Sequence, residues 1–460
     1  MRDASAVAGA PVDVRPSVVT RLRDRTLVLD LAVVGGLALL LGLVRLGAPS
    51  FWVDEAATAR AVHMPVSWLV DRQYHVLHYL LLKPWVTVTG TSEVALRLPS
   101  VIGTVLSCAL LVVLARKLFD RRVALVAGAF LAASPFLLKW SQQARGYTLV
   151  VTVALAATLL LLRALERGSR WSWAIYGLAF SAVVVWHPVS GVLLAPAHAV
   201  VLAQRRDRLL PHGLLGGAVV LALAVPWAAV VAMRSTGEGV AMNWLKFPTA
   251  ETAVRALLDV SGAAGVGLAL ALGGLWHLRR SGRALLATWL GVWAFAPFAL
   301  ALGVSVVRPI YLDRYLIIAA PAFALLAGVA LTALPLRFRV VGAVAAVVGT
   351  GVGLGLWYAA ATEDGNWRAE DWRSAVTAVL EREDEADAIV VAPWSARPAA
   401  RYYGAEVVDT STAASIWVLT WSETGDELAL AERRALGFGE HRLVERIPFG
   451  WRVHAELWRR

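Results

Sequence analysis

The chain has 460 residues, of which 58% are hydrophobic and 17% are charged, and its mean hydropathy is +0.63. These values lie outside the usual range of soluble globular proteins and indicate a polytopic membrane protein. The net charge of +11 is no argument for nucleic-acid binding, because much of it lies in short Arg-rich segments between apolar runs.

Apolar runs long enough to cross a hydrocarbon core of about 30 Å recur along the first three quarters of the chain. By this length rule we expect about eleven membrane-spanning helices, at residues 28–47, 95–115, 122–139, 147–165, 172–188, 189–203, 213–233, 256–276, 284–305, 315–335 and 340–360. The first run is longer than the roughly 7 to 15 apolar residues of a signal peptide, and further runs follow it, so we expect a retained anchor.

Arg-rich segments give the predicted orientation. They occur at every second connection, in the tail of residues 1–27 and at 116–122, 163–170, 204–208, 277–283 and 336–339. Because positively charged loops stay in the cytoplasm, we expect the N-terminal tail inside and the C-terminal part outside. The predicted organisation is a basic tail at 1–27, a transmembrane domain at 28–360 with an outer loop at 48–94, and an extracytoplasmic domain at 361–460.

The outer loop begins with two adjacent carboxylates, Asp54 and Glu55, directly after the first predicted span. Its second half, "HVLHYLLLKPWVTVTG" at 75–90, is too short to span, and a Lys-Pro pair interrupts it. We therefore expect a juxtamembrane helix that lies along the interface and is kinked at its proline, with His75 and His78 on one face.

Polar residues from distant parts of the chain map to the same outer face. They are Asp54, Glu55, His63, Asp71, His75, His78, Lys83, the segment "KWSQQARGY" at 139–147 with Gln143, Arg145 and Tyr147, His187, and the segment "RPIYLDRY" at 308–315 with Asp313, Arg314 and Tyr315. Acid, base and aromatic groups that gather at one membrane surface favour a site there.

Each of these signals also has an ordinary explanation. An Asp-Glu pair in a loop is often a solvated helix end, two histidines at this spacing often pack at the interface, and an Arg-Tyr pair at a helix start often anchors it. The twenty tryptophans are first of all an aromatic belt, and only a few, such as Trp52, Trp140 or Trp244, are candidates for stacking on a sugar.

Four segments carry a resemblance to a known family. They are "DE" at 54–55, "HVLHYLLLKPW" at 75–85 with "GTSEVALRLPS" at 90–100, "SPFLLKWSQQARGYTL" at 134–149, and "RPIYLDRYLIIAAP" at 308–321. The chain resembles the membrane-embedded glycosyltransferases of the GT-C superfamily, in particular the protein-O-mannosyltransferase-like group (glycosyltransferase family 39) and related bacterial enzymes that use polyprenyl-phosphate sugars. The resemblance covers most of residues 28–360, although many relatives have His-Pro-Pro where this chain has "HVLH".

The resemblance implies a GT-C-like helical membrane fold and a lipid-phosphate sugar donor. Such a donor also suits an outward-facing site, because nucleotide sugars stay in the cytoplasm. By the family motif, Asp54 is the expected general base and Glu55 a neighbour that orients or tunes it. Arg314, Arg145, Lys83 and Tyr315 are expected to bind the donor phosphate, and further substrate contacts are expected from His75, His78, Gln143, Tyr147, His187 and Asp313. The transfer is expected to invert the anomeric carbon, so that a β-linked lipid mannose gives an α-mannoside.

No cofactor is expected, because guanidinium groups can neutralise the phosphate. In the alternative reading, Asp54, Glu55, Asp71 and the histidines hold a divalent cation. The expected partners are a polyprenyl-phosphate-linked sugar donor, the lipid bilayer, and a glycan, lipid or protein acceptor, with no nucleic acid. Abundant Arg and Ala beside only four lysines indicate a GC-rich bacterial genome, so we expect a bacterial plasma membrane and a mannose or arabinose donor.

The predicted C-terminal domain alternates between helical and strand patterns. Helices are expected at 369–384 and 426–436, strands at 388–393 and 416–421, and more strands after residue 441. This alternation suggests a small α/β sandwich. It has no disulfide, because the only cysteine is Cys108 in the second predicted span. It lacks a Gly-rich phosphate loop and a Ser-His-Asp order, so we expect it to bind the acceptor or to stabilise the outer face.

Two other classes of protein fit the membrane topology. A transporter or lipid flippase usually places charges or broken helices near the midplane, often in two matching halves, whereas these predicted spans have few central charges and no internal repeat. A non-catalytic scaffold would leave the outer-face Asp, His and Arg residues without a purpose.

Overall fold

The computed structural model describes residues 25–72, 75–205, 212–234, 245–359, 370–382, 386–411, 413–422, 428–450 and 452–460. The predicted basic tail up to residue 24, Trp244, and parts of the segments at 204–208, 369–384 and 426–436 lie outside these residues. The chain forms two compact units, each described here by itself. The helical unit contains residues up to Val44, Val70–His78 and Leu98–Leu354, and the mixed unit contains Arg45–Leu69, Tyr79–Arg97 and Gly355–Arg460. The division predicted at residues 27 and 360 stays a prediction.

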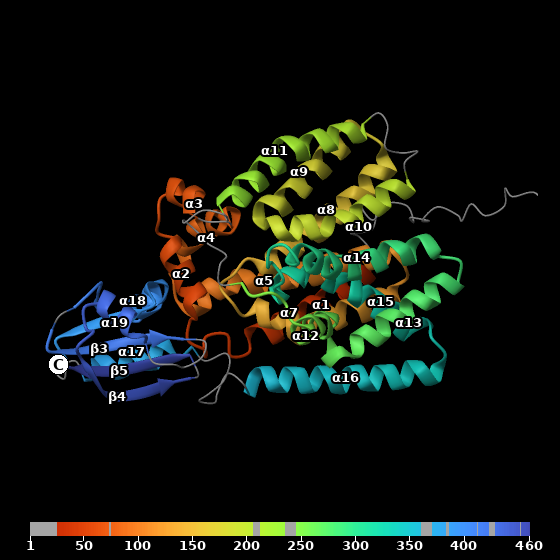
Figure 1. Ribbon diagram of the computed structural model, residues 1–460. Coiled ribbons are helices and arrows are strands. Elements are labelled where there is room, and N and C mark those ends of the chain that lie inside the picture. The colour runs from red at the N-terminus through yellow and green to blue at the C-terminus, as the bar shows by residue number, and fades with distance from the viewer. Residues whose placement is uncertain are drawn as a thin grey trace, which may run out of the picture. The chain divides into compact units, whose positions relative to one another are not determined.

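Long apolar helices make up the helical unit (Figure 1). They are α1 (Arg25–Leu43), α5 (Glu93–Leu118, which starts in the mixed unit), α6 (Arg121–Ala132), α7 (Pro135–Ser141), α8 (Tyr147–Arg167), α9 (Arg170–Trp186), α10 (Pro188–Gln204), α11 (Gly213–Arg234), α12 (Ala250–Ser261), α13 (Val266–Arg280), α14 (Ala284–Ser305), α15 (Ala320–Ala333) and α16 (Leu336–Ala359), with 3₁₀ turns η3 (Ala263–Gly265) and η4 (Asp313–Ala319).

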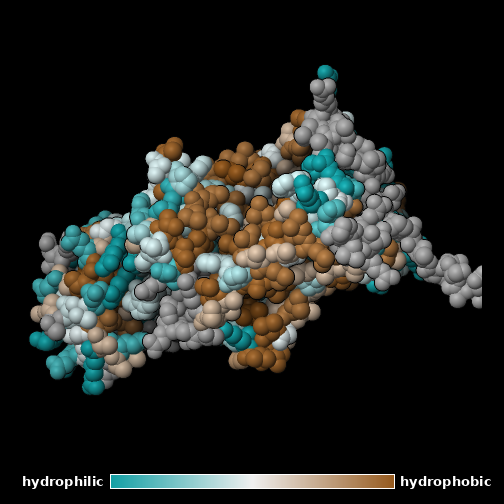
Figure 2. Space-filling view, turned by 90° about the horizontal axis from the view of Figure 1, so that it is seen from above, coloured by the Kyte–Doolittle hydropathy of each residue, from teal (hydrophilic) through white to brown (hydrophobic). Residues whose placement is uncertain are grey.

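Seven helices among the described residues are long and apolar enough to cross a membrane, and two bent pairs raise this number to nine. The remaining predicted spans, at 172–188 and 189–203, are the helices α9 and α10, which have 17 residues each. Hydrophobic side chains cover much of the helical part of the surface in Figure 2. The prediction of a polytopic helical membrane protein is therefore confirmed, whereas the count of eleven spans and the orientation stay predictions.

Two glycines and two alanines with positive φ angles form the sharper of the two bends. Helices α12 and α13 meet at 107°, because residues 262–265 between them all have φ between 49° and 87°. A Cβ at Gly267 would lie 1.8 Å from the Ser261 carbonyl oxygen, so this turn requires glycine there. The 57° bend between α6 and α7 follows Ser134, which caps α7 through its hydroxyl, and Pro135, the first residue of α7.

Helix α5 contains a proline whose missing hydrogen bond is replaced by a side chain. Pro99 has no N–H, so the Ala95 carbonyl four residues earlier loses its helical partner. The indole Nε1 of Trp85, from helix α4 (Val76–Thr89), donates to that carbonyl at 2.8 Å. The start of α5 thus remains helical without a buried unpaired carbonyl at this position.

The mixed unit contains helix α2 (Val53–Ala61), α3 (Val66–Arg72) up to Leu69, α4 from Tyr79 onward, and a five-stranded sheet. The strands are β1 (Ala388–Ala392), β2 (Val407–Val408), β3 (Ser415–Trp421), β4 (Arg442–Phe449) and β5 (Val453–Arg459), in the order β2-β1-β3-β5-β4. Strand β1 is parallel to β2 and β3, whereas β5 is antiparallel to β3 and β4.

Both faces of the sheet are covered, as its apolar strands require. On one face, Val390, Val418 and Trp458 pack with Phe438, which follows helix α19 (Leu430–Ala435). On the other face lie α17 (Trp372–Leu380) and α18 (Arg397–Tyr402). The small C-terminal α/β sheet predicted from the alternating pattern is confirmed.

Candidate active site

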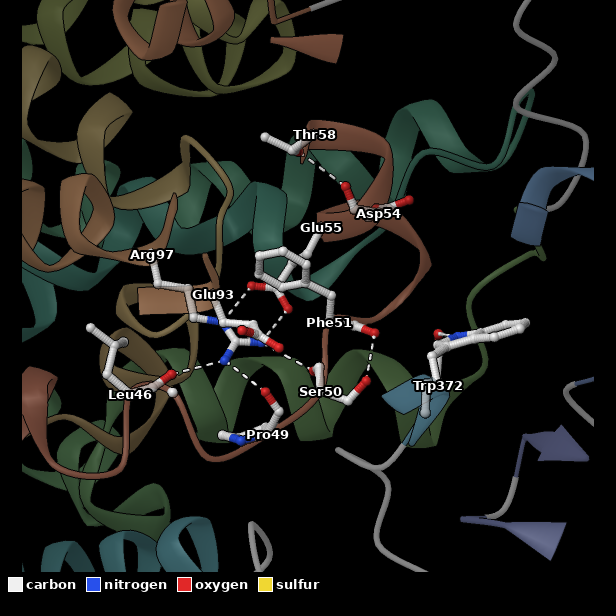
Figure 3. A network of polar contacts seen from close by, with 12 residues as sticks. Leu46, Pro49, Ser50, Phe51, Asp54, Glu55, Thr58, Glu93, Arg97 and Trp372 are labelled. Carbon is white, nitrogen blue, oxygen red and sulfur yellow. Dashed lines mark hydrogen bonds and ion pairs between the residues drawn. The ribbon is translucent and has the colours of Figure 1, made fainter. Parts of the chain in front are cut away.

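The Asp-Glu pair opens helix α2 in the mixed unit, and its two side chains have different surroundings. Glu55 is 1% exposed, whereas Asp54 is only partly buried. In Figure 3 the Glu55 carboxylate points toward Arg97, and that of Asp54 points away from it. Carboxylates in the first turn of a helix are stabilised by its dipole. Glu55 is therefore placed for a structural role with Arg97, whereas the carboxylate of Asp54 is accessible for another role.

Glu55 forms a buried, two-pronged ion pair with Arg97 (Figure 3). The guanidinium donates from Nε to Oε1 and from Nη2 to Oε2, both at 2.8 Å. It also donates to the carbonyl oxygens of Leu46, Pro49 and Ser50 at 2.8 to 3.1 Å. Arg97 therefore fixes both the turn that precedes α2 and its first residues.

Arg97 is not among the site residues predicted from the sequence. The available signal was a lone arginine inside an otherwise apolar run, "EVALRLPS", because an ionisable residue in a predicted span usually has a partner. Glu93 in the same segment accepts from Arg373 at 2.6 Å and from the Tyr403 hydroxyl at 2.9 Å. Both of these donors come from the C-terminal sequence.

Lys83 lies at the other end of α2. Its Nζ donates to the carbonyl oxygens of Val62 and Met64, at 2.9 and 2.7 Å. Val62 is the C-cap residue of α2, where unpaired carbonyl groups and the helix dipole favour a cation. The ammonium group of Lys83 is therefore already bound to backbone oxygen in this structure.

The helical unit brings most of the other predicted residues together in one aromatic and basic cluster. The rings of His75 and His187 stack with centroids 5.0 Å apart. Tyr315 lies edge-on to His187 at 4.8 Å, and Tyr147 lies 5.9 Å from it. His187 is the residue at which α9 ends and α10 begins. This cluster is called the His-Tyr cluster below.

Two arginines border the His-Tyr cluster. The Arg145 guanidinium carbon lies 5.9 Å from the centre of the Tyr147 ring, and that of Arg314 lies 5.9 Å from the centre of the Tyr315 ring. The ring of His187 is buried, and the charges of Arg314 and Arg145 both act on it. These charges therefore act on a single point, which is an arrangement suited to an anion.

His78 lies on the same side of this unit. Burial, followed by the charges of Arg145 and His75, lowers its pKa to about 3, so its ring is neutral at physiological pH. A Cβ on Gly146 would lie 2.6 Å from the Trp186 indole nitrogen and 3.1 Å from the His78 ring. The chain between Arg145 and Tyr147 is thus packed tightly against His78.

The turn at residues 142–146 sets the position of Arg145. Its carbonyl accepts from the Ser100 hydroxyl at 2.8 Å. Gln142 donates to the carbonyl oxygens of Gly42 and Val44 at the end of α1. The neighbouring Gln143 has a buried side-chain oxygen with no hydrogen-bond partner among the described residues. An acceptor of this kind suits a donor from outside the chain, such as a hydroxyl group.

Asp313 and Lys139 form an ion pair at 2.9 Å in the helical unit. The other Asp313 oxygen accepts from the backbone N–H of Arg314 at 2.7 Å. Asp313 thus fixes the backbone that carries Arg314.

The structure shows no metal-binding cluster in its described parts. No group of three or more His, Cys, Asp or Glu side chains there is placed to hold an ion, and His63 and Asp71 are exposed. The expectation of a metal-free site stays a prediction.

Part of the chain matches a known protein family. Residues 76–229 match the family model described as dolichyl-phosphate-mannose-protein mannosyltransferase. No curated protein matches the chain.

Solved structures of similar fold cover most of the chain. ArnT from Cupriavidus metallidurans bound to undecaprenyl phosphate matches with a TM-score of 0.61 and 17% identity, over 94% of this chain and 97% of ArnT. The oligosaccharyltransferase of Archaeoglobus fulgidus matches at 0.53 and 14%, over 83% of this chain and 64% of its own. The mycobacterial arabinofuranosyltransferase AftD matches at 0.53 and 16%, over 93% of this chain and 39% of its own.

The match at residues 76–229 and the likeness in fold to these solved membrane glycosyltransferases confirm the resemblance found in the sequence, and the fold is that of a multi-pass membrane protein of GT-C type. Residues 76–229 resemble the protein-mannosyltransferase group, whose description names a lipid-linked mannose. These matches favour the enzyme over the transporter and scaffold alternatives.

Proposed function

We propose that the chain transfers a sugar, with mannose favoured, from a polyprenyl-phosphate donor to an acceptor hydroxyl at the outer face of a bacterial plasma membrane. The observation that carries this proposal is the position of Arg145 and Arg314 at the border of the His-Tyr cluster in the helical unit. A lipid phosphate is the anion that a membrane-embedded basic site would meet. The undecaprenyl phosphate bound to ArnT and the family description of residues 76–229 agree with this choice.

In this proposal the two arginines hold the donor phosphate. Guanidinium groups match phosphate oxygens in pairs of hydrogen bonds and keep their charge at any physiological pH. The phosphate gains negative charge as its bond to the sugar breaks, so Arg145 and Arg314 stabilise the transition state more than the bound substrate. Tyr147 and Tyr315 supply further hydroxyl donors, and the side-chain oxygen of Gln143 accepts from a hydroxyl group of the substrate. We leave Lys83 out of the phosphate site, because α2 already uses its ammonium group.

Asp54 acts as the general base. It removes the proton of the acceptor hydroxyl while that oxygen forms a bond to the anomeric carbon. The bond from this carbon to the phosphate oxygen breaks on the opposite side, and the polyprenyl phosphate leaves with the electron pair. The single displacement inverts the configuration. Glu55 is neutralised by Arg97 and orients the first turn of α2, which carries Asp54.

The test is sugar transfer in proteoliposomes from radiolabelled polyprenyl-phosphate mannose and arabinose donors, with wild type, Asp54→Asn and Arg314→Ala. Asp71→Asn is the matched control, because it removes an exposed carboxylate from the same loop. We expect Asp54→Asn to lower kcat by about a thousandfold, the order typical of general-base loss, and Asp71→Asn to change it by less than about threefold. Wild-type transfer by Asp54→Asn would rule out this base, and no transfer from any donor by wild type would rule out this donor class.

A further inference from the structure

The first turn of α2 has no side-chain cap in its own sequence. The N-cap residue is Trp52, with φ −82° and ψ 170°, and it makes no side-chain capping hydrogen bond. An indole has a donor and no acceptor, so the Trp52 side chain cannot accept from the first N–H groups of the helix. The backbone N–H groups of Glu55 and Ala56 donate to the Trp52 carbonyl at 3.0 Å, but that of Val53, the first residue of the helix, needs an acceptor from elsewhere.

A carboxylate more than three hundred residues away provides one. Oε2 of Glu370 accepts from the backbone N–H of Val53, the first residue of α2, at 3.0 Å. Glu370 is only 3% exposed. Its orientation is set by the Trp372 indole, which donates to the same oxygen at 3.4 Å, and by Arg452, whose Nη1 lies 3.5 Å from Oε1. The first N–H of α2 is therefore capped by the C-terminal sequence.

A second side chain holds the preceding residue in the same way. The Tyr403 hydroxyl oxygen accepts from the backbone N–H of Phe51 at 2.7 Å and donates to Glu93 at 2.9 Å. The neighbouring Tyr402 ring lies 4.8 Å from the Phe51 ring. Residues 51 and 53 thus each give their backbone N–H to a buried or partly buried side chain of the C-terminal sequence.

We propose that Glu370 and Tyr403 are positioning residues for catalysis, and that the C-terminal sequence completes the active site by capping α2 and so aiming the carboxylate of Asp54. This inference rests on the proposed function, in which Asp54 is the base. It gives the C-terminal sheet a catalytic task besides any contact with the acceptor. The side chains themselves touch neither the sugar nor the phosphate.

The test compares Glu370→Ala, which removes the acceptor, with Glu370→Gln, whose amide oxygen still accepts from Val53. Glu445→Ala is the matched control, because it removes a carboxylate of strand β4 and breaks its ion pair with Arg382, which follows α17. A nitroxide on Ala57→Cys, in a Cys108→Ala background, reports the order of α2 without reference to activity. All variants are full-length proteins in proteoliposomes that contain the polyprenyl-phosphate donor transferred by wild type.

We expect Glu370→Ala to lower kcat about tenfold to hundredfold with the donor KM nearly unchanged, the loss typical of a displacement of about 1 Å. The label should become more mobile in the same variant. Glu370→Gln and Glu445→Ala should stay within about threefold of wild type in kcat. Wild-type kcat and label mobility in Glu370→Ala would overturn the proposal, and so would a Glu370→Gln variant as impaired as Glu370→Ala.

The label separates this proposal from the base assignment. If Asp54→Asn transfers sugar like wild type while Glu370→Ala still frees the label, the general base lies elsewhere and the cap on α2 stands. Tyr403→Phe provides an independent check, because it removes one hydroxyl and keeps the ring. Its label should also become more mobile, and an unchanged label would remove Tyr403 from the proposal.

Discussion

Loss of Arg97 should destabilise the protein far more than loss of an ordinary arginine. Its side chain and that of Glu55 are each 2% exposed, and two hydrogen bonds of 2.8 Å join them. Removing one partner of such a pair leaves a buried, unpaired charge, which typically costs about 3–5 kcal/mol. The carbonyl oxygens of residues 46, 49 and 50 lose their donor as well. We therefore expect Arg97→Met to lower the free energy of unfolding by at least about 3 kcal/mol.

The assay is unfolding by SDS in mixed micelles, with a double-mutant cycle between Arg97→Met and Glu55→Gln. Because the double variant leaves no unpaired charge, its loss should be smaller than the sum of the two single losses by about 2 kcal/mol or more. Arg255→Met is the matched control. The side chains of Arg255 and its partner Glu251 are 72% and 77% exposed. Arg255→Met should therefore lower the free energy of unfolding by about 0.5 kcal/mol or less. Losses that add within about 0.5 kcal/mol would refute the coupling argued from the geometry.

Three further predictions concern the charged residues of the two units. Arg314→Ala should lower kcat about tenfold or more and also raise the KM for the lipid donor, because Arg314 binds the phosphate and binds it more tightly in the transition state. The free energy of unfolding should stay near that of wild type, which steady-state transfer and SDS unfolding check. Lys83→Met should do the reverse, with an unchanged donor KM and a loss of about 1–3 kcal/mol, because two carbonyl groups at the end of α2 lose their donor. Burial raises the pKa of Glu370 above its ordinary value, against the opposing charge of Arg452. The folded protein then holds this proton more tightly than the unfolded chain, so wild type should lose stability as pH rises from the ordinary glutamate range through the raised pKa. Glu370→Gln, which cannot ionise, should lack that step in SDS unfolding measured against pH.

Much of the fold follows from local patterns in the sequence. Each of the eleven apolar runs is helical in the structure, because a run of about twenty apolar residues has to satisfy its own backbone in lipid. The predicted span at 256–276 contains a bend at residues 262–265 that its apolar pattern does not indicate. Its signal was the glycine-rich stretch "SGAAGVG" at 261–267, in which positive φ angles interrupt the helix.

The sequence predicts which residues belong to the site better than it predicts which of them contact one another. The order of segments suggested Asp54, Arg145 and Arg314, but nothing in two adjacent acidic residues says which of them is buried. That choice depends on Arg97, which lies 42 residues from Glu55 along the chain. The caps on α2 come from Glu370 and Tyr403, more than three hundred residues away. Contacts of this kind arise from tertiary packing and leave no periodic trace in a single sequence.

The hydrogen bond from Trp85 to the carbonyl that Pro99 leaves without a helical partner links the residues allowed at positions 85 and 99. The indole donates to the Ala95 carbonyl only because proline cannot. A chain with another residue at position 99 would supply its own N–H, and the donor at position 85 would then be free to change. A chain that keeps the proline and loses the tryptophan would leave a buried acceptor unpaired, at a cost of about 1–3 kcal/mol. Among homologues, these two positions should therefore vary together, although they lie on different helices.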